Sequence, residues 1–352
     1  MGFKLNIATI SLLLILTSTA RAQSGVFDVR NYGAQANGDI TLVQGTLQAP
    51  GDPSFFKDAS WVTLERIDSL TLSGGGTFDG QGKTAWGKND CSKNKFCSPL
   101  PINIRLNFVT NSEIRDITSL DSKQFHINVL GCQNVTFRRV TITAPEDSLN
   151  TDGIHIGRST GIRIIDSHIG TGDDCVSLGD GSKDIVVKGV SCGPGHGISI
   201  GSLGKYDGEE PVVGVKVIGC TLTKTMNGVR IKTWPNSFDG AASHMRFENI
   251  TMDNVANPII IDQVYCPYNQ CQAEIPSKIK ISKVSFENIR GTTTTKQAVQ
   301  LHCSKALPCQ NVQLRDIDLA YNGNDGDAIS ECINVTPNID GIQNPPACSV
   351  KA

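Results

Sequence analysis

The chain has 352 residues, with 32 Lys and Arg against 34 Asp and Glu, so its formal net charge is −2. A balance this close to neutral argues against a nucleic-acid binder that relies on bulk positive charge, and we expect no nucleic-acid partner. An acidic substrate stays open, because it needs only a local basic patch. The 35 glycines and the aromatic content of 6% favour many tight turns over an aromatic-rich core.

The first 22 residues have the pattern of a secretory signal peptide. Lys4 gives a positive start, Ile7 to Leu16 is an apolar run, and Ala20-Arg21-Ala22 fits a small-x-small cleavage site. The apolar run is too short to span a membrane, and no later stretch is long and apolar enough. The sequence therefore predicts a secreted, extracellular chain that starts at Gln23 and has no membrane anchor.

The cysteine pattern agrees with export. All twelve cysteines follow residue 90, and local pairs in an exported protein are typical of disulfides. Proximity predicts five pairs, and the two cysteines left over lie in strand-like sequence, where we expect buried free thiols. The absence of a CxxC motif and the scarcity of His argue against a metal site. Three sequons, at Asn134, Asn249 and Asn334, are candidate glycan sites. The predicted pairs are Cys91/Cys97, Cys175/Cys192, Cys266/Cys271, Cys303/Cys309 and Cys332/Cys348, with Cys132 and Cys220 free.

Seven segments of the chain resemble one another. Each is a short run with alternating apolar residues, a break, and a second short run rich in Val, Ile and Thr, a pattern typical of strands. Self-similar strands at this period favour a solenoid over a β-sandwich. The sequence therefore predicts an all-β fold, a single right-handed parallel β-helix that forms one domain over residues 23–352. The segments begin at Asn134, Gly161, Asp184, Gly214, His244, Lys278 and Asn311.

Four polar motifs recur at about the spacing of these coils. Each alone is a good turn sequence or a solvated strand face, and a structural turn is the ordinary interpretation of one such motif. Together, at intervals of 21, 23 and 34 residues between Asp152, Asp173, His196 and Arg230, they predict one patch on neighbouring coils. The motifs are Asn150-Thr151-Asp152, Gly172-Asp173-Asp174-Cys175, Gly195-His196-Gly197 and Arg230-Ile231-Lys232.

These four motifs, NTD, GDD, GHG and RIK, resemble those of the polygalacturonases, a pectin-degrading glycoside hydrolase family. The sequence around them, such as Thr77 to Asn111 and Asp121 to Gly131, is most similar to the plant pollen exopolygalacturonases. The resemblance covers nearly the whole secreted chain. It implies hydrolysis of α-1,4-galacturonosidic bonds in polygalacturonan, exo-acting and with inversion, by a monomer that needs no cofactor or metal.

The resemblance also implies roles for the acidic residues. Asp173 is expected to be the general acid, with Asp152 and Asp174 positioning and deprotonating the water. His196 is expected to hydrogen-bond near the acid and set its protonation. Adjacent coils lie about 4.8 Å apart, which is closer than the separation usual for inverting pairs, so spacing alone favours retention. We follow the family and predict inversion.

Three further residues are expected to bind substrate. The resemblance implies that Arg230 and Lys232 hold the galacturonate carboxylate, Arg as a planar fork and Lys as a point charge. Tyr265 matches the family's substrate-contacting tyrosine, although an ordinary edge aromatic is nearly as good an interpretation of it.

Three alternatives remain open at this stage. Endo cleavage differs only in subsites at the ends of the groove. A calcium-dependent pectate lyase would share the fold and the acidic cluster but cleave by elimination. A wall protein that binds pectin without cutting it is the non-enzymatic alternative.

One departure from the family lies near the N-terminus. Val26 to Ala34 matches the family's opening, but Asn37-Gly38-Asp39 runs almost directly into Ile40 to Leu47, which resembles much later family sequence. The resemblance implies that some tens of residues are missing at about this join. The N-terminal cap of the solenoid is therefore predicted to be shortened, which leaves strand edges and apolar residues exposed.

Overall fold

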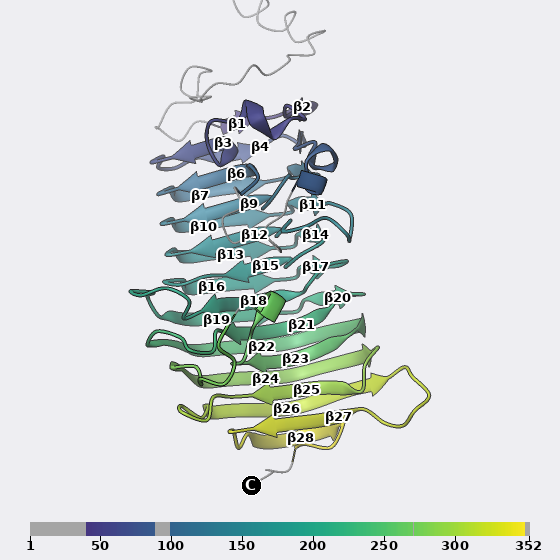
Figure 1. Ribbon diagram of the computed structural model, residues 1–352. Helices are drawn as coiled ribbons and strands as arrows, with labels where there is room; N and C mark the ends of the chain where they lie inside the picture. The colour runs from purple at the N-terminus through teal and green to yellow at the C-terminus, as the bar shows by residue number, and fades with distance from the viewer. Residues whose placement is uncertain (1–39, 89–98, 270, 349–352) are drawn as a thin grey trace, which may run out of the picture.

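The computed structural model describes residues 40–88, 99–269 and 271–348. Within these ranges the chain winds through successive coils whose strands pair in parallel with the coil before and the coil after (Figure 1). The predicted all-β, right-handed parallel β-helix is confirmed. The predicted signal peptide, the join near Asp39 and the Cys91/Cys97 pair lie outside the described residues.

One wall of the helix is a ten-stranded parallel sheet. Its strands follow one another along the chain, one from each coil, and this sheet carries the polar motifs. The strands are β3 (Ser60–Glu65), β6 (Ile102–Asn107), β9 (Ile127–Leu130), β12 (Ile154–Gly157), β15 (Val176–Leu178), β18 (Ile198–Leu203), β21 (Asn227–Thr233), β23 (Asn257–Asp262), β25 (Gln297–His302) and β27 (Ile329–Ile333).

The remaining strands form a second sheet with two columns. One column holds β1 (Ile40–Leu42), β4 (Thr71–Ser73), β7 (Thr110–Arg115), β10 (Gln133–Arg138), β13 (Thr160–Ile165), β16 (Lys183–Lys188), β19 (Val212–Ile218), β22 (Gly240–Val255), β24 (Ile279–Thr293), β26 (Gln310–Tyr321) and β28 (Asn338–Asn344). The other holds β2 (Thr46–Gln48), β5 (Thr77–Asp79), β8 (Thr118–Leu120), β11 (Thr141–Thr143), β14 (His168–Gly170), β17 (Ser191–Cys192) and β20 (Thr221–Thr223). Four short 3₁₀ helices lie in the described loops: η3 (Pro53–Phe55), η4 (Gly82–Thr84), η5 (Trp86–Lys88) and η6 (Pro267–Asn269).

In six of the seven repeated segments the first residue marks a corner of the coil. Asn134, Asp184, His244 and Asn311 have φ between 51° and 58°, the left-handed region that Asn and Asp tolerate better than most residues. The apolar residues after each corner point inward and stack, coil upon coil, into one buried cluster that runs from Leu64 to Val335. This continuous core supports the predicted architecture, in which each coil is held by its neighbours.

One predicted repeat is five residues out of register. The sequence analysis starts a segment at Lys278, but Met245 pairs with Val284, and the corner residue of that coil is Lys283, with φ 55°. The cause is the long strand β24, in which Ile279 and Ile281 extend the same alternation toward the N-terminus. Because the side-chain period in a strand is two, alternation alone did not show where the corner falls.

The first described coil is thin and partly exposed. Strands β1 and β2 have three residues each, and among the described residues they pair only with the following coil, β1 with β4 and β2 with β5. Leu42 is 64% exposed and Leu47 is 43% exposed. Such exposed apolar side chains agree with the expected effect of a shortened cap, which itself stays a prediction.

Several smaller predictions can be checked directly. Four of the five predicted disulfides are present, and Cys132 and Cys220 are buried free thiols, as expected. The sequon residues Asn134, Asn249 and Asn334 are exposed, while their glycan occupancy stays a prediction. No helix in the described ranges is long and apolar enough to cross a membrane.

Candidate active site

The four polar motifs meet on the outer face of the ten-stranded sheet. Ile154 pairs with Val176, Val176 with Ile198, and Ile198 with Val229, so the motifs lie on four successive coils. The same register places Asp174 opposite Asp152, and the Gly153 amide donates to the Asp174 carbonyl at 2.9 Å. The interval of 21 residues in the sequence suggests instead that Asp173 lies opposite Asp152. The coil length here is 22 residues, so Asp174 rather than Asp173 occupies the position equivalent to that of Asp152.

Asp174 is a buried carboxylate held by two cations. Its Oδ1 accepts from Ser199 Oγ at 2.7 Å and from Arg230 Nη2 at 3.1 Å, and its Oδ2 accepts from Lys232 Nζ at 2.8 Å. Burial acts to raise the pKa of Asp174, but Lys232 and Arg230 overcome this effect and hold the pKa below its usual value. Asp174 is therefore ionised at neutral pH.

Asp152 has the opposite electrostatic environment. It is buried, and its Oδ2 accepts from Ser177 Oγ at 2.7 Å. Burial raises the pKa of Asp152 well above its usual value, and the neighbouring carboxylates of Asp173 and Asp174 raise it further. Two carboxyl groups on adjacent coils thus have pKa values pushed in opposite directions by their surroundings.

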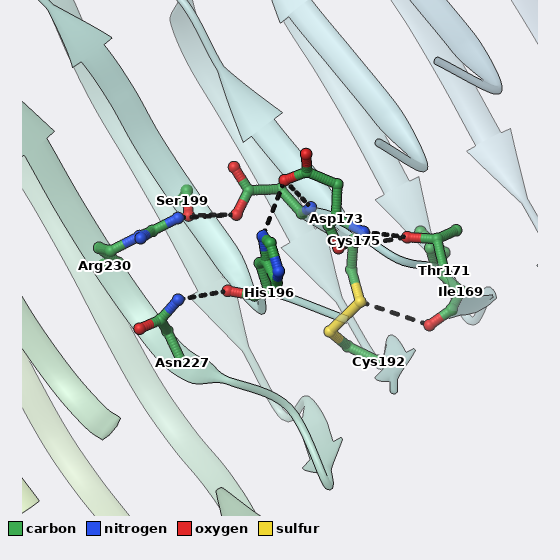
Figure 2. Close-up of a disulfide and its surroundings, with 10 residues drawn as sticks. Ile169, Thr171, Asp173, Cys175, Cys192, His196, Ser199, Asn227 and Arg230 are labelled. Atoms are coloured by element: carbon green, nitrogen blue, oxygen red, sulfur yellow. Dashed lines mark hydrogen bonds and ion pairs between the residues drawn. A yellow bond between two sulfur atoms is a disulfide. The ribbon is translucent and has the colours of Figure 1, made fainter. Parts of the chain in front are cut away.

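Asp173 is the most accessible of the three carboxylates. Its side chain is 20% exposed, against 1% for Asp174. His196 Nδ1 lies 3.0 Å from Asp173 Oδ1, and the backbone amide of Asp174 donates to the same oxygen at 2.8 Å. Figure 2 shows the ring of His196 turned toward this carboxylate. Asp173 can therefore reach a group bound on the outer face while its neighbours fix its orientation.

Arg230 and Lys232 have an internal partner. Both side chains are largely buried, and both contact Asp174. Burial alone would lower the pKa of Lys232, but the Asp174 carboxylate raises it above its usual value. Tyr265 lies beside them, with its ring centroid 5.2 Å from Lys232 Nζ and 5.8 Å from Arg230 Cζ. Their contact with substrate stays a prediction, whereas their ion pairs with Asp174 are present in the structure.

Sequence analysis missed the residues that orient the carboxylates. Ser177 and Ser199 donate to Asp152 and Asp174, and His155 Nδ1 lies 2.7 Å from Ser177 Oγ. Burial lowers the pKa of His155 to about 4, so the ring is neutral at neutral pH. His155, Ser177, Ser199 and Arg230 occupy one register position on successive strands. An alignment of the coils at the correct period would have found them.

The spacing of three side chains in the cluster would also suit a metal ion. One possible ligand atom from each of Asp173, Asp174 and His196 lies within 4.8 Å of the others. However, both oxygens of Asp174 already accept from positively charged groups. A further cation would sit against Arg230 and Lys232, so the donor set fits a salt-bridged carboxylate better than a calcium site.

A disulfide fixes the segment that carries Asp173 and Asp174. Cys175, the next residue, is bonded to Cys192 at the end of β17, 17 residues further on (Figure 2). The two cysteines join the ten-stranded sheet to the second sheet across the coil. This cross-link limits movement of the adjacent carboxylates.

Comparison with known proteins agrees with this geometry. The family model described as "Glycosyl hydrolases family 28" matches residues 20–348. An exopolygalacturonase of Oenothera organensis is 60% identical over 311 residues, which cover 88% of this chain and 86% of that protein. A polygalacturonase of Gossypium hirsutum is 48% identical over 384 residues, which cover 96% of this chain and 94% of that protein. The solved polygalacturonase of Erwinia carotovora has a TM-score of 0.66 and 25% identity over 86% of this chain and 81% of its own.

The longer alignment bears on the shortened N-terminal region. Its 384 positions exceed the 352 residues of this chain, so at least 32 positions of the cotton relative have no counterpart here. This agrees with missing residues, while their location near Asp39 stays a prediction. The match over residues 20–348, together with relatives at 48–60% identity, shows that the chain belongs to glycosyl hydrolases family 28.

Proposed function

We propose that this chain is a polygalacturonase that hydrolyses the α-1,4-galacturonosidic bonds of polygalacturonan. The observation that carries the proposal is the trio of carboxyl groups, in which Asp174 is held ionised, Asp152 has a raised pKa and Asp173 is accessible. Glycoside hydrolysis needs one carboxyl group that gives a proton and another that activates water. The names of the relatives in Oenothera and cotton support polygalacturonan as the substrate.

In this proposal Asp173 protonates the leaving glycosidic oxygen. His196 contacts Asp173 and keeps the carboxyl group in position for that transfer. Asp152 and Asp174 position and deprotonate the attacking water, which arrives from the other side and inverts the anomeric carbon. Asp152 must be ionised to accept a proton, so its raised pKa sets a lower pH limit for activity.

Arg230, Lys232 and Tyr265 form the proposed contact with the galacturonate next to the scissile bond. Asp174 takes up only some of the donors of these two cations, because Lys232 carries three N–H donors and Arg230 five. Donors not used on Asp174 can meet a substrate carboxylate. The ring of Tyr265 covers the same two side chains and would place the sugar against them.

The finer features of the proposal rest on the relatives. The Oenothera protein and one of Platanus acerifolia are named exopolygalacturonases, which supports exo cleavage, with endo cleavage as the alternative. We propose further that the chain acts as a monomer outside the cell, at the cell wall. The disulfides support an oxidising compartment.

The proposal is tested by incubating the purified chain with polygalacturonate and measuring new reducing ends, ultraviolet absorbance and viscosity, with and without a chelator. Hydrolysis by an exo enzyme predicts reducing ends that are insensitive to chelator, no ultraviolet product and a slow fall in viscosity. An unsaturated product that disappears with chelator would establish a lyase instead. Binding to the polymer without any new reducing ends would establish a wall protein, and a rapid fall in viscosity would replace exo with endo action.

A further inference from the structure

The register position that carries His155, Ser177, Ser199 and Arg230 continues toward the N-terminus. On the preceding strands β9, β6 and β3 the same position holds Asn128, Arg105 and Thr63. Every residue of this column is polar from β3 to β21. The column therefore extends the polar outer face of the ten-stranded sheet beyond the strands that carry the catalytic motifs.

Within the part of the chain that the structure describes, Arg105 is a cation without a partner. Among the described residues its guanidinium makes no hydrogen bond and no ion pair, and its Nε is buried from solvent without an acceptor. Arg230, at the same position five strands later, donates to both Asp174 and Ser199. Arg105 thus differs from Arg230 in that no described residue accepts from its guanidinium.

A second group on the same strand is also unsatisfied. Asn107 lies two residues after Arg105, hence on the same face of β6, and its Oδ1 is buried without a hydrogen-bond donor in the described ranges. Asn128, which pairs with Arg105 across the two strands, is half-buried, and no hydrogen bond engages its side-chain amide within the described coils. Buried polar groups normally have partners, and each exception requires an explanation such as a ligand or an ordered water.

The position of these groups is imposed by the core. Ile104 and Leu106 point inward and are 1% and 0% exposed, so the alternation of the strand forces Arg105 and Asn107 outward. Adjacent strands lie about 4.8 Å apart, which places the Arg105 backbone about 10 Å from that of His155, two strands away. Arg105 therefore lies on the N-terminal side of the three carboxylates, whereas the sugar expected at Arg230 and Lys232 lies on their C-terminal side.

We propose that Arg105, assisted by Asn107 and Asn128, binds the carboxylate of a galacturonate unit on the N-terminal side of the catalytic carboxylates. The proposal rests on the proposed function, because it assigns a second subsite to the same polyanionic substrate. A planar guanidinium with free donors matches a carboxylate in two parallel hydrogen bonds. The amide of Asn128 can donate to the same carboxylate, and a sugar hydroxyl can donate to Asn107 Oδ1.

The test measures binding in a chain that cannot turn over. Asp173→Asn serves as the background, and the dissociation constant for tetragalacturonate is measured by calorimetry with and without Arg105→Gln. We expect the added substitution to weaken binding about tenfold or more, and Arg105→Lys to weaken it less, because Lys keeps the charge and loses the fork. Arg163→Gln, which removes a surface arginine from the second sheet, is the matched control and should leave the dissociation constant unchanged.

The outcomes separate this inference from the proposed function. Unchanged binding in both Arg105 variants would overturn the inference and mean that only water satisfies these groups. If Arg105→Gln does not fold, Arg105→Lys alone decides, since an unchanged dissociation constant there would contradict a two-pronged contact. Failure of the Asp173→Asn background itself to bind tetragalacturonate would count against both proposals. Failure of the wild type to release reducing ends, with binding and the Arg105 effect intact, would overturn only the hydrolytic function.

Discussion

Replacing Asp173 by Asn is expected to lower the rate of polygalacturonate cleavage by about 10² to 10⁴-fold, the usual loss when a general acid is removed. The amide keeps the size of the side chain and can still contact His196, but its N–H protons are far too weakly acidic to be transferred to the leaving oxygen. Substrate affinity should change little, so the loss should fall on kcat. The measurement is the initial rate of reducing-end release at saturating polygalacturonate.

The matched control for this substitution is Asp184→Asn. Asp184 is an exposed aspartate on the second sheet, paired with Arg163, and its replacement should leave the rate unchanged. Wild-type-like turnover by a correctly folded Asp173→Asn variant would show that the accessible carboxylate is not the acid. Asp152, with its raised pKa, would then be the next candidate for that role.

Replacing Asp174 by Asn is expected to destabilise the fold by about 3–5 kcal/mol, the usual cost of breaking a buried ion pair by removing one partner. Asp174 is 1% exposed and is the contact that Arg230 and Lys232 share. Without its charge the two cations would face each other in a site with little water. The measurement is the free energy of unfolding at neutral pH, from denaturant titration.

Asp152→Asn is the matched comparison, and its effect on the free energy of unfolding should have the opposite sign. Burial and two neighbouring carboxylates disfavour a charge on Asp152, so a neutral amide in its place should stabilise the fold above the pKa of Asp152 while abolishing activity.

The pKa shifts of Asp174 and Asp152 also determine how the stability of the wild type depends on pH. The lowered pKa of Asp174 gives stability that is present above its unfolded-state pKa and lost as pH falls through the folded-state pKa. The raised pKa of Asp152 gives stability that is full below its unfolded-state pKa and lost as pH rises through the folded-state pKa.

Melting temperature measured against pH for the wild type and both variants tests these signs. Asp174→Asn should approach the wild type only at low pH, where Asp174 is protonated in both states. Asp152→Asn should exceed the wild type only at higher pH. Equal losses in the two variants at neutral pH would contradict the assigned charge states.

The architecture and the convergence of the motifs could be predicted because both depend on periodicity. Inward Val, Ile and Leu recur in every coil, and the corners fall at residues such as Asn134 and Asp184 that tolerate a left-handed backbone. Once the coil period is known, motifs one period apart must be neighbours. Asp174 and Arg230, 56 residues apart in the sequence, are brought within 3.1 Å in this way.

The sequence could not show which residue of one coil pairs with which residue of the next. Spacing counted from Asp173 was one residue out, so Asp174 rather than Asp173 lies opposite Asp152. The alternation of β24 likewise hid a displacement of five residues at Lys278. Both errors arise because loops and corners of different length set the coil period, so intervals counted in the sequence do not fix the register of one strand on the next.

Side-chain partners were also beyond sequence analysis. Ser177 and Ser199 are ordinary strand residues in the sequence, and only their register with Asp152 and Asp174 reveals them as donors. Arg230 and Lys232 were predicted to meet the substrate, and their shared contact with Asp174 follows from the path of β21 past β15 and β18. Charge pairing of this kind depends on distances of a few ångström, which a spacing rule does not resolve.

The most direct test of the central claim is a proton NMR time course of polygalacturonate with the purified chain. Hydrolysis with inversion at the three carboxylates predicts that free galacturonate appears from the first spectra as the β anomer, which then equilibrates with the α anomer. The matching spectrum with Asp173→Asn should show no product on the same timescale. An α anomer formed first, or an unsaturated sugar, or an unchanged polymer spectrum would contradict the account.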